Sequence, residues 1–284
     1  MNNPFLTIGM ATFDDFHGVY FSIQALRMYH PEIMDEVEIL IIDNNPNGEH
    51  GKQCKAFSNW GKNIRYIPEP NWISTAVRNK IFEEARGDFV MSMDCHVMFD
   101  PGSIKKLIDY YKNNFKTNNL HQGPMLYDNL EGFSTHFDPV WRSQMYGIWG
   151  KDERGGDPNA EPFEIPMQGL GIFTCRKEAW LGFNKAFKGF GGEEGYIHEK
   201  FRQSGNKCLC LPFLRWNHRF ARPDGVKYPL TLDNKVRNYF IGHVELNLDV
   251  KPIFDHFSEF TSKDNLEKLH REAILEIEKQ QNQQ

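Results

Sequence analysis

Hydrophobic positions in the first hundred residues follow two patterns. Some form short apolar runs at residues 5–12, 37–43 and 88–94, and residues 63–70 are a further short predicted strand. Between these runs, two stretches carry apolar side chains at helical spacing, at residues 18–29 and 74–87. Continuous apolar strands that alternate with amphipathic helices indicate a parallel sheet covered on both faces. We therefore predict an α/β fold with a mostly parallel central sheet and helices on both faces. In the second helix, Ser74 is the expected N-cap and Gly87 the expected C-terminal stop.

The middle of the chain has a different composition. Residues 128–166 are rich in Gly, Pro, Asp and Trp and show no clear period. An irregular segment this long is usually functional or disordered, and disordered segments are poor in aromatic residues. Because this segment contains Trp141, Tyr146 and Trp149, we predict a functional loop.

Regular structure is expected again after this loop. We predict a strand and a short helix at residues 167–180, a glycine-rich turn that opens a helix at 189–205, and a single strand at 207–220 that ends at His218. The last segment, residues 262–284, has an apolar helical stripe and is predicted to be a docking helix with a frayed polar end. The stripe consists of Leu266, Leu269, Ala273 and Ile277.

Composition and charge narrow the class of protein. The 284 residues, 14% of them aromatic, suit a folded soluble protein with one large domain or a domain with extensions. No apolar run reaches the roughly 18 residues of a membrane-spanning helix, and the N-terminus lacks the pattern of a secretory signal. Five scattered cysteines, with Cys208 and Cys210 spaced unlike a zinc pair, indicate reduced thiols and a cytoplasmic protein. The net charge of −5 argues against a broad nucleic-acid surface.

Polar side chains end three of the predicted strands. Thr12, Asp43 and Asp94 stand at carboxyl ends, where open α/β sheets bind their ligands. Asp94 and His96 are two residues apart, so on a strand they share a face and offer an oxygen and a nitrogen to the same object. The alternative is a strand end that turns into solvent, with Asp-Pro-Gly-Ser at residues 100–103 making the turn.

Four pieces of sequence occur in order along the chain. They are "IIDNN" at a strand end, "VRN" on a helix, "MDCH" at a strand end, and "GGEE" followed by "WNHRF". The set resembles GT-A-fold glycosyltransferases of the family 2 type, most of all the polypeptide N-acetylgalactosaminyltransferases and the β-1,4-galactosyltransferases. The resemblance runs from about Leu6 to Phe220, which is most of the chain.

The resemblance implies a divalent cation, Mn²⁺ or Mg²⁺, bound by Asp94, His96 and His218. A cation also makes chemical sense, because a departing nucleoside diphosphate gains negative charge that a divalent ion neutralises. Carboxylate and imidazole ligands together suit Mn²⁺, with diphosphate oxygens completing its shell. Taken alone, His218 is better explained as a surface histidine beside Arg219.

The resemblance further implies a nucleotide-sugar donor, most simply a UDP-sugar. It gives Asp43 the role of accepting the uracil N–H, places Thr12 and Phe13 in the base pocket, and brings Arg78 to the base or the diphosphate. The alternatives are that Asp43 only starts a turn and that Arg78 is a solvated or salt-bridged charge.

Two glycines and three tryptophans are candidates for contacts with the donor sugar and the acceptor. By resemblance, Gly169 and Gly171 lie on a strand beneath the donor sugar, while the alternative is a β-bulge or close backbone packing. Trp141, Trp149 and Trp216 are candidates for stacking on a sugar or another flat acceptor, although core packing is the more common role of tryptophan.

Glu193 and Glu194 open a predicted helix after a glycine-rich turn. In inverting relatives an acid at the second position is the general base, which maps to Glu194, and Glu193 maps to the acid that holds the acceptor. The retaining N-acetylgalactosaminyltransferases have Asn at the position of Glu194. This chain departs from them, so we predict inversion. The alternative is that both glutamates merely cap the helix.

These features together predict a metal-dependent glycosyltransferase of the hexosyltransferase class. The acceptor is expected to be a hydroxyl of a glycan, a peptide, a small molecule or a modified nucleic acid. We predict a catalytic domain at residues 1–222, divided into a nucleotide-binding half at about 1–100 and an acceptor-binding half at 101–222 that contains the loop 128–166. Residues 223–284 are predicted to form a C-terminal helical extension.

Three other functions fit the same motifs. In the first, the acceptor is a hydroxylated base in DNA, and the loop 137–166 and the basic run Arg215, Arg219 and Arg222 bind the nucleic-acid backbone. A non-catalytic module that binds sugar nucleotides or glycans is possible on the same fold, although Glu194 speaks against it. A metal-dependent hydrolase would release free sugar as fast without an acceptor as with one.

Overall fold

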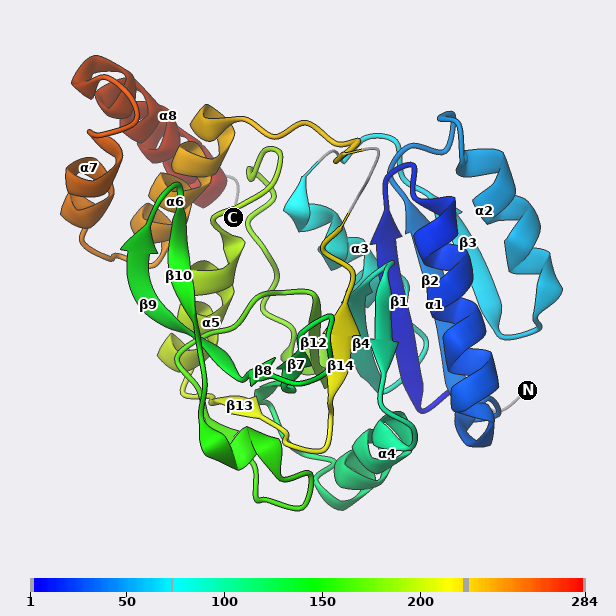
Figure 1. Cartoon of the computed structure of the whole chain (residues 1–284). Coiled ribbons are helices and arrows are strands. Elements are labelled where there is room, and N and C mark those ends of the chain that lie inside the picture. The colour runs from blue at the N-terminus through cyan, green and yellow to red at the C-terminus, as the bar shows by residue number, and fades with distance from the viewer. Residues whose placement is uncertain (1–2, 73, 222–224, 283–284) are drawn as a thin grey trace.

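The structure is a computed structural model that describes residues 3–72, 74–221 and 225–282 (Figure 1). Its largest sheet has eight strands in the order β11-β13-β6-β12-β4-β1-β2-β3. The predicted strands of the first hundred residues are confirmed as four parallel neighbours: β1 (Leu6–Thr12), β2 (Val37–Asp43), β3 (Ile64–Pro68) and β4 (Phe89–Asp94). The parallel register aligns Thr12 with Asp43, and Ala11 with Asp94, at one edge of the sheet.

The other half of the sheet mixes strand directions. Strand β12 (Ile172–Arg176) runs antiparallel to both β4 and β6 (Leu120–Gln122). Beyond β6 lie β13 (Cys208–Cys210), which is parallel to it, and β11 (Phe163–Glu164), which is antiparallel to β13. The α/β class and the parallel nucleus are confirmed, while β11 and β12 make the sheet a mixed one.

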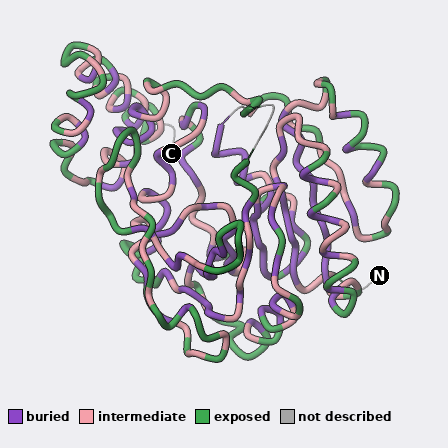
Figure 2. Tube along the Cα trace, in the orientation of Figure 1, coloured by how far each residue is buried: buried purple, intermediate pink, exposed green. Residues whose placement is uncertain are grey.

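Both faces of the sheet are covered, as the continuous apolar strands predicted. Along β2, Ile39 and Ile41 pack on one side with α1 (Phe16–Tyr29), α2 (Gly51–Phe57) and α4 (Ser103–Asn113). Leu40 and Ile42 face the other side, where the covering helices are α3 (Arg78–Glu84), α5 (Glu193–Gln203) and α6 (Leu232–Glu245). In Figure 2 the buried stretches of the chain lie mainly in the centre of the molecule, where these helices pack on the sheet.

The segment 207–220 is not one strand, and that prediction is wrong. It forms β13 in the main sheet and β14 (Trp216–His218) in a second sheet of order β5-β14-β7-β8. Pro212 has no N–H for a sheet ladder, and the chain turns there, with the Leu214 N–H donating to the Leu211 carbonyl. The other strands of this sheet are β5 (Val97–Phe99), β7 (Met125–Leu126) and β8 (Phe133–Ser134).

The segment 128–166 is more regular than its sequence suggested. Its longest regular part is a hairpin of β9 (His136–Arg142) and β10 (Met145–Gly150), which pair only with each other among the described strands. Because much of the hairpin is exposed on both faces, its sequence lacks the alternation that marks a half-buried strand.

Helices complete the chain after residue 231. Helix α6 is followed by α7 (Lys251–Phe257) and α8 (Lys263–Gln281), and the predicted apolar stripe of α8 is buried. Phe240 of α6 and Ile277 of α8 belong to the same apolar cluster as Phe173 of the sheet. The polar end of the tail, predicted to be frayed, stays helical through Gln281, and residues 283–284 lie outside the described residues. Among the described helices, none is both long and apolar enough to cross a membrane.

The predicted helix 74–87 differs at both ends. Ser74 caps a short 3-10 turn, Thr75–Val77, and the α-helix then ends at Glu84. Gly87 is not its C-terminal stop. A Cβ at this position would lie 2.6 Å from the backbone nitrogen of Thr7, so glycine is required by close packing against β1.

Replacing Gly87 by alanine is expected to lower the free energy of unfolding by about 2 kcal/mol, because backbone atoms of β1 must move. Urea denaturation measures this difference. Gly156→Ala is a matched control, since its new methyl would meet only the Phe133 ring, at 3.2 Å. Equal stability of the two variants would contradict the packing explanation.

Candidate active site

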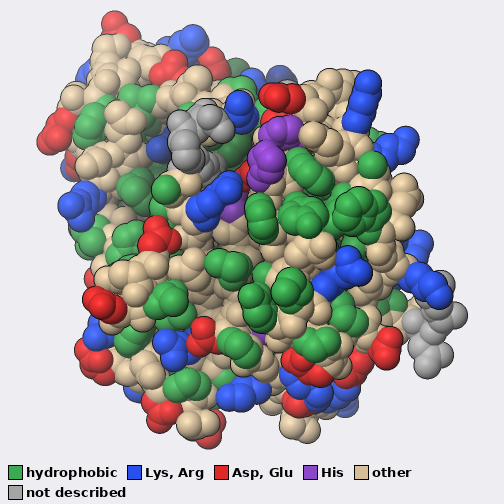
Figure 3. Space-filling view, turned by 45° about the vertical axis from the view of Figure 1, so that its right-hand side comes forward, with side chains coloured by type: hydrophobic (Ala, Val, Ile, Leu, Met, Phe, Trp, Pro, Cys, Tyr) green, Lys and Arg blue, Asp and Glu red, His purple; other side chains and the backbone are tan. Residues whose placement is uncertain are grey.

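A cavity of about 440 Å³ opens at the carboxyl ends of β1 and β4. Its size is in the range of small-molecule sites. Thr12, Phe13, Arg78, Asp94 and His96, all predicted from the sequence, line it. Figure 3 shows histidine, acidic and basic side chains close together on this side of the molecule.

Three predicted metal ligands converge beside this cavity, which two of them, Asp94 and His96, line. The Nε2 atoms of His96 and His218 are 3.2 Å apart, and Asp94 Oδ2 lies 3.4 Å from the His218 Nε2 and 4.0 Å from the His96 Nε2. One carboxylate oxygen and two imidazole nitrogens therefore surround a single point, a donor set that suits a divalent transition metal. Burial opposes ionisation of Asp94, but its interactions with His218 and Arg78 hold its pKa well below the usual range.

The two sheets bring these ligands together. Asp94 ends β4, and its N–H donates to the Gly171 carbonyl at 2.8 Å. In the second sheet, β14 pairs with β5 so that His218 lies opposite Val97, next to His96. A Cβ on Gly171 would lie 2.6 Å from the Trp216 ring, so the small residue at 171 lets the two sheets approach.

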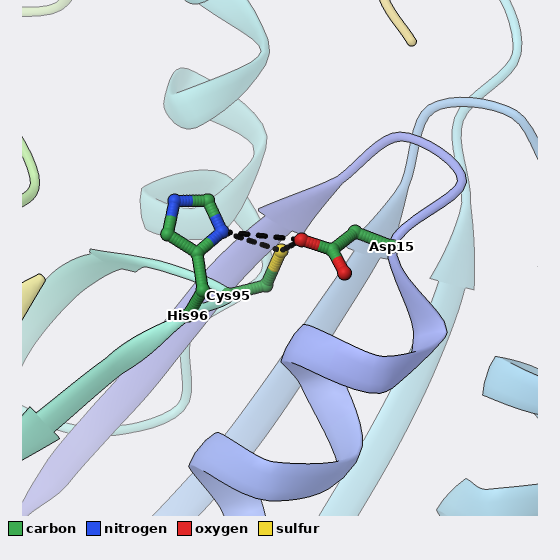
Figure 4. Close-up of side chains that lie close together, drawn as sticks. All are labelled: Asp15, Cys95 and His96. Atoms are coloured by element: carbon green, nitrogen blue, oxygen red, sulfur yellow. Dashed lines mark hydrogen bonds and ion pairs between the residues drawn. The ribbon is translucent and has the colours of Figure 1, made fainter. Parts of the chain in front are cut away.

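A second group of polar side chains contacts the Nδ1 side of the His96 ring, away from His218 (Figure 4). Asp15 Oδ2 lies 3.2 Å from His96 Nδ1 and 3.7 Å from Cys95 Sγ. Arg219 Nη2 contacts the two Asp15 oxygens at 3.3 and 3.0 Å. Burial opposes the charge of Asp15, but the hydrogen bonds from His96 and from the Gly18 N–H, together with Arg219, lower its pKa strongly.

Arg78 links the metal-ligand cluster to the predicted catalytic acids. It begins α3, is nearly buried, and places its guanidinium 3.1 Å from Asp94 Oδ1 and 3.5 Å from Glu193 Oε1. It also donates to the Thr75 hydroxyl at 2.6 Å. Burial opposes its charge, yet the Asp94 and Glu193 carboxylates raise its pKa. Arg78 is therefore a salt-bridged charge, as the alternative interpretation of the sequence predicted. Its contact with the donor stays a prediction.

The glycine-rich turn places Glu193 and Glu194 in the first turn of α5. Gly191 and Gly192 have φ values of 99° and 91°, which only glycine adopts freely. Gly192 occupies the N-cap position, so neither glutamate caps the helix with its side chain. Glu193 is buried, and its Oε2 atom has no hydrogen-bond partner within the part of the chain that the structure describes.

Glu194 has the properties of a proton acceptor. Its burial, and then the Glu193 carboxylate, raise its pKa to about 8, against the opposing charges of Arg78 and Lys235. A general base works best when its pKa lies near the working pH. Tyr239 of α6 interacts with this carboxyl. Burial, and then the Glu194 charge, raise the pKa of Tyr239, so its hydroxyl is uncharged at neutral pH.

Replacing Glu194 by glutamine is expected to stabilise the protein at alkaline pH. Because the pKa is raised in the folded state, the stability that this carboxyl contributes is fully present below about pH 4.5 and is lost as the pH rises through about 8. One pKa unit corresponds to about 1.4 kcal/mol, and solvent screens this partly exposed group, so we expect a gain of about 1–2 kcal/mol at pH 9. Urea unfolding at pH 4 and pH 9 measures it. The same gain at both values, or in a Glu199→Gln control, would contradict this assignment.

Asp43, Gly169 and Gly171 do not line the cavity. Both oxygens of Asp43 are engaged, Oδ2 by the Tyr66 hydroxyl at 2.8 Å and Oδ1 by the Asn45 N–H at 3.0 Å. The turn-forming alternative is thus realised, and the uracil contact stays a prediction. A Cβ on Gly169 would lie 3.1 Å from the Phe137 ring, so close packing is realised there as well.

The three tryptophans have different surroundings. Trp216 is buried and donates to the Gly123 carbonyl at 2.8 Å, so it belongs to the core. Trp141 packs against Tyr239 and against His256 of α7. Trp149 stays partly exposed on β10, and its ring lies 6.3 Å from that of Phe220, two residues after His218. Trp149 therefore remains the best candidate for stacking on an acceptor.

Sequence reasoning missed several residues of the site, above all Asp15. The signal was present, because Asp14 and Asp15 come just after Phe13, the first residue beyond β1, and Asp15 is the N-cap of α1. The structure also lines the cavity with residues that no motif marked: Asp14, His17, Glu49 and His50.

The predicted basic run is not an open cationic surface in its described part. Arg215 pairs with Asp100 at 3.4 Å, and Arg219 pairs with Asp15. Arg222 lies outside the described residues. The nucleic-acid acceptor stays a prediction without support from these contacts.

The sequence matches a known family over more than half of its length. The family model described as glycosyl transferase family 2 matches residues 7–178. The chain belongs to glycosyl transferase family 2. The matched range begins in β1 and ends just after β12, so it includes Asp94 and His96. The family resemblance predicted from the motifs is confirmed.

Solved structures with a similar fold include three glycosyltransferases. GalNAc-T7 with UDP, GalNAc and Mn²⁺ has a TM-score of 0.67 at 14% identity, over 86% of this chain and 48% of that one. The mannosyltransferase of Pyrobaculum calidifontis with GDP-Man and Mn²⁺ has a TM-score of 0.57 at 11% identity, over 97% and 75%. S. aureus TarS 1–349 with UDP-GlcNAc has 0.55 at 12% identity, over 90% and 71%. At these identities the likeness confirms the predicted GT-A fold.

A curated relative matches a shorter stretch. The dolichol-phosphate mannosyltransferase of Saccharomyces cerevisiae is 30% identical over 81 residues, which cover 28% of this chain and 30% of the yeast protein. This family 2 chain thus spans only part of the yeast relative and about half of GalNAc-T7.

Proposed function

We propose that this family 2 protein is a metal-dependent glycosyltransferase that uses a nucleotide-sugar donor. The observation that supports it most is the convergence of Asp94, His96 and His218 on one point beside the cavity, which Asp94 and His96 line. Family membership supports sugar transfer as the reaction.

The residues present fit a divalent cation such as Mn²⁺. Asp94 is held ionised, and the two facing Nε2 atoms are an arrangement that a shared cation stabilises. A cation bound there neutralises charge on the donor diphosphate and polarises its bond to the sugar. Arg78 keeps Asp94 in place and adds positive charge beside the cavity.

Glu194 is proposed to act as general base in an inverting transfer. It takes the proton of the acceptor hydroxyl while that oxygen bonds to the anomeric carbon, and the bond between this carbon and the diphosphate oxygen breaks with its electron pair. The raised pKa of Glu194 supports this role, because the carboxylate is then basic enough to accept the proton. Glu193, held by Arg78, is proposed to bind the acceptor.

We further propose a UDP-sugar as donor and a hydroxylated glycan, peptide or small molecule as acceptor. UDP or a UDP-sugar is bound in two of the similar structures, whereas GDP-Man is bound in the third. The hairpin β9–β10 lies beside α6, where the Tyr239 hydroxyl accepts from the Tyr146 N–H. It also lies beside the start of α5, because a Cβ on Gly195 would be 3.0 Å from the Tyr146 ring. Exposed Trp149 on this hairpin, whose ring lies 6.3 Å from that of Phe220, supports an acceptor surface on this side of β10.

A panel of UDP- and GDP-sugars tests this proposal. Each is incubated with the protein and either Mn²⁺ or EDTA, and nucleotide release and thermal stabilisation are measured. We expect one UDP-sugar to give release that requires Mn²⁺. Release that EDTA does not reduce, or no binding of any sugar nucleotide with Mn²⁺ present, would overturn it.

A further inference from the structure

His96 presents its two ring nitrogens to two different groups. Nε2 faces Asp94 and His218, whereas Nδ1 lies 3.2 Å from Asp15 Oδ2 (Figure 4). A neutral imidazole carries its proton on one nitrogen and a lone pair on the other. Only the nitrogen with the lone pair can bind a metal, so the position of this proton decides whether His96 is a ligand.

We propose that Asp15 is a positioning residue that holds the proton of His96 on Nδ1 and so directs the Nε2 lone pair at the cation site. This inference rests on the proposed function. An ionised carboxylate only accepts hydrogen bonds, so the contact with Asp15 requires a proton on the facing nitrogen. In metal sites, a carboxylate behind a histidine ligand fixes the tautomer and the ring orientation in this way.

The surroundings of Asp15 keep it an acceptor in a fixed orientation. Its Oδ1 accepts the Gly18 N–H at 2.9 Å as the N-cap of α1, and Arg219 contacts both oxygens. Cys95 Sγ lies 3.7 Å from Oδ2. The groups around Asp15 are donors, and together they prevent its carboxylate from rotating away from His96.

The distance between the two histidines is compatible with the same tautomer. With the Nε2 atoms of His96 and His218 at 3.2 Å, at most one proton fits between them. If His96 carries its proton on Nδ1, its Nε2 accepts from His218 without conflict.

A cation held by Asp15, Cys95 and His96 themselves is the competing explanation, because their ligand atoms also lie within 4.8 Å of one another. Arg219 argues against it. Its guanidinium is 3.0 Å from Asp15 Oδ2 and already balances this carboxylate, and a metal ion there would be repelled by it.

Asp15→Asn tests the proposal with little change in shape. Asparagine is as good an N-cap as aspartate, and with its oxygen on the Gly18 N–H it turns an NH₂ group toward His96. In this orientation Arg219 keeps only its contact with the capping oxygen, His96 Nδ1 accepts from the NH₂ group, and the His96 proton moves to Nε2. In metal-free protein, ¹⁵N NMR of labelled histidines is expected to show this change of tautomer. In calorimetry the Kd for Mn²⁺ is expected to rise by about 10–100-fold.

Asp152→Asn is the matched control. Asp152 is likewise an N-cap aspartate that accepts the N–H of a following residue, Arg154, and pairs with an arginine, but it lies away from the cavity. It is expected to change neither readout. Asp15→Ser, which keeps a capping oxygen too short to reach His96, is expected to show both tautomers.

Two results would overturn the proposal. One is wild-type, metal-free protein with the His96 proton on Nε2, a measurement that needs no variant. The other is Asp15→Asn protein that binds Mn²⁺ as tightly as wild type. Wild-type protein with the Nδ1 proton but no affinity for Mn²⁺ would overturn the proposed function instead and support the tautomer assignment.

Discussion

Replacing Asp94 by asparagine is expected to lower nucleotide release from the donor by about a thousandfold. The variant loses the one carboxylate ligand of the cluster. A metal ion contributes several kcal/mol to charge stabilisation in such reactions, and about 4 kcal/mol corresponds to a thousandfold in rate. Single-turnover release of nucleotide at saturating donor measures the effect, and calorimetry is expected to show weaker Mn²⁺ binding.

Stability must be separated from chemistry in this variant. Asp94 also pairs with buried Arg78, which keeps its contacts with Glu193 and Thr75 when asparagine replaces the acid. We expect a loss of about 1–3 kcal/mol in the free energy of unfolding with an unchanged fold. Asp109→Asn, the same chemical change at an exposed residue of α4, is the control. Release at the wild-type rate by folded Asp94→Asn would contradict the metal-ligand role.

Replacing Glu194 by glutamine is expected to lower sugar transfer by about 10²–10⁴-fold, the usual contribution of a general base. Binding of Mn²⁺ and of the donor is expected to stay within a few-fold of wild type, because Glu194 does not line the cavity of the cation cluster. In wild type, the rate is expected to rise with pH as Glu194 loses its proton, and this limb is expected to disappear in the variant.

Glu199→Gln, on the same helix and paired with Arg202, is the control for this substitution. The anomeric configuration of sugar released to water, observed by ¹H NMR, tests the stereochemistry separately. An α-linked donor is expected to give the β-sugar first. Retention of configuration, together with unchanged transfer by Glu194→Gln, would remove Glu194 from the mechanism.

The parts of the fold that were predictable are those with one dominant signal. Strands β1, β2 and β4 are buried on both faces, so their apolar runs mark their bounds almost to the residue. The hairpin β9–β10 is exposed and carries no such signal. The break at Pro212 was visible in the sequence, but only tertiary structure shows that β13 and β14 belong to different sheets.

The site was predictable to the extent that its motifs are local. Asp94 and His96 are two residues apart at a strand end, and the later His218 follows from the family resemblance. Asp15 is different, because its sequence signal marks only a helix start. That its second oxygen meets His96 depends on how the turn after β4 packs on α1, which no local pattern encodes. The buried link through Arg78 depends on long-range packing in the same way.

Crystals grown with Mn²⁺ and UDP provide the most direct test of the central claim. Anomalous scattering at the manganese edge locates the ion independently of the protein coordinates. The predicted result is one anomalous peak bonded to Asp94, His96 and His218, with diphosphate oxygens completing its shell. UDP bound in the cavity with no manganese on these three residues, or with the ion at Asp15 and Cys95 instead, would contradict the claim.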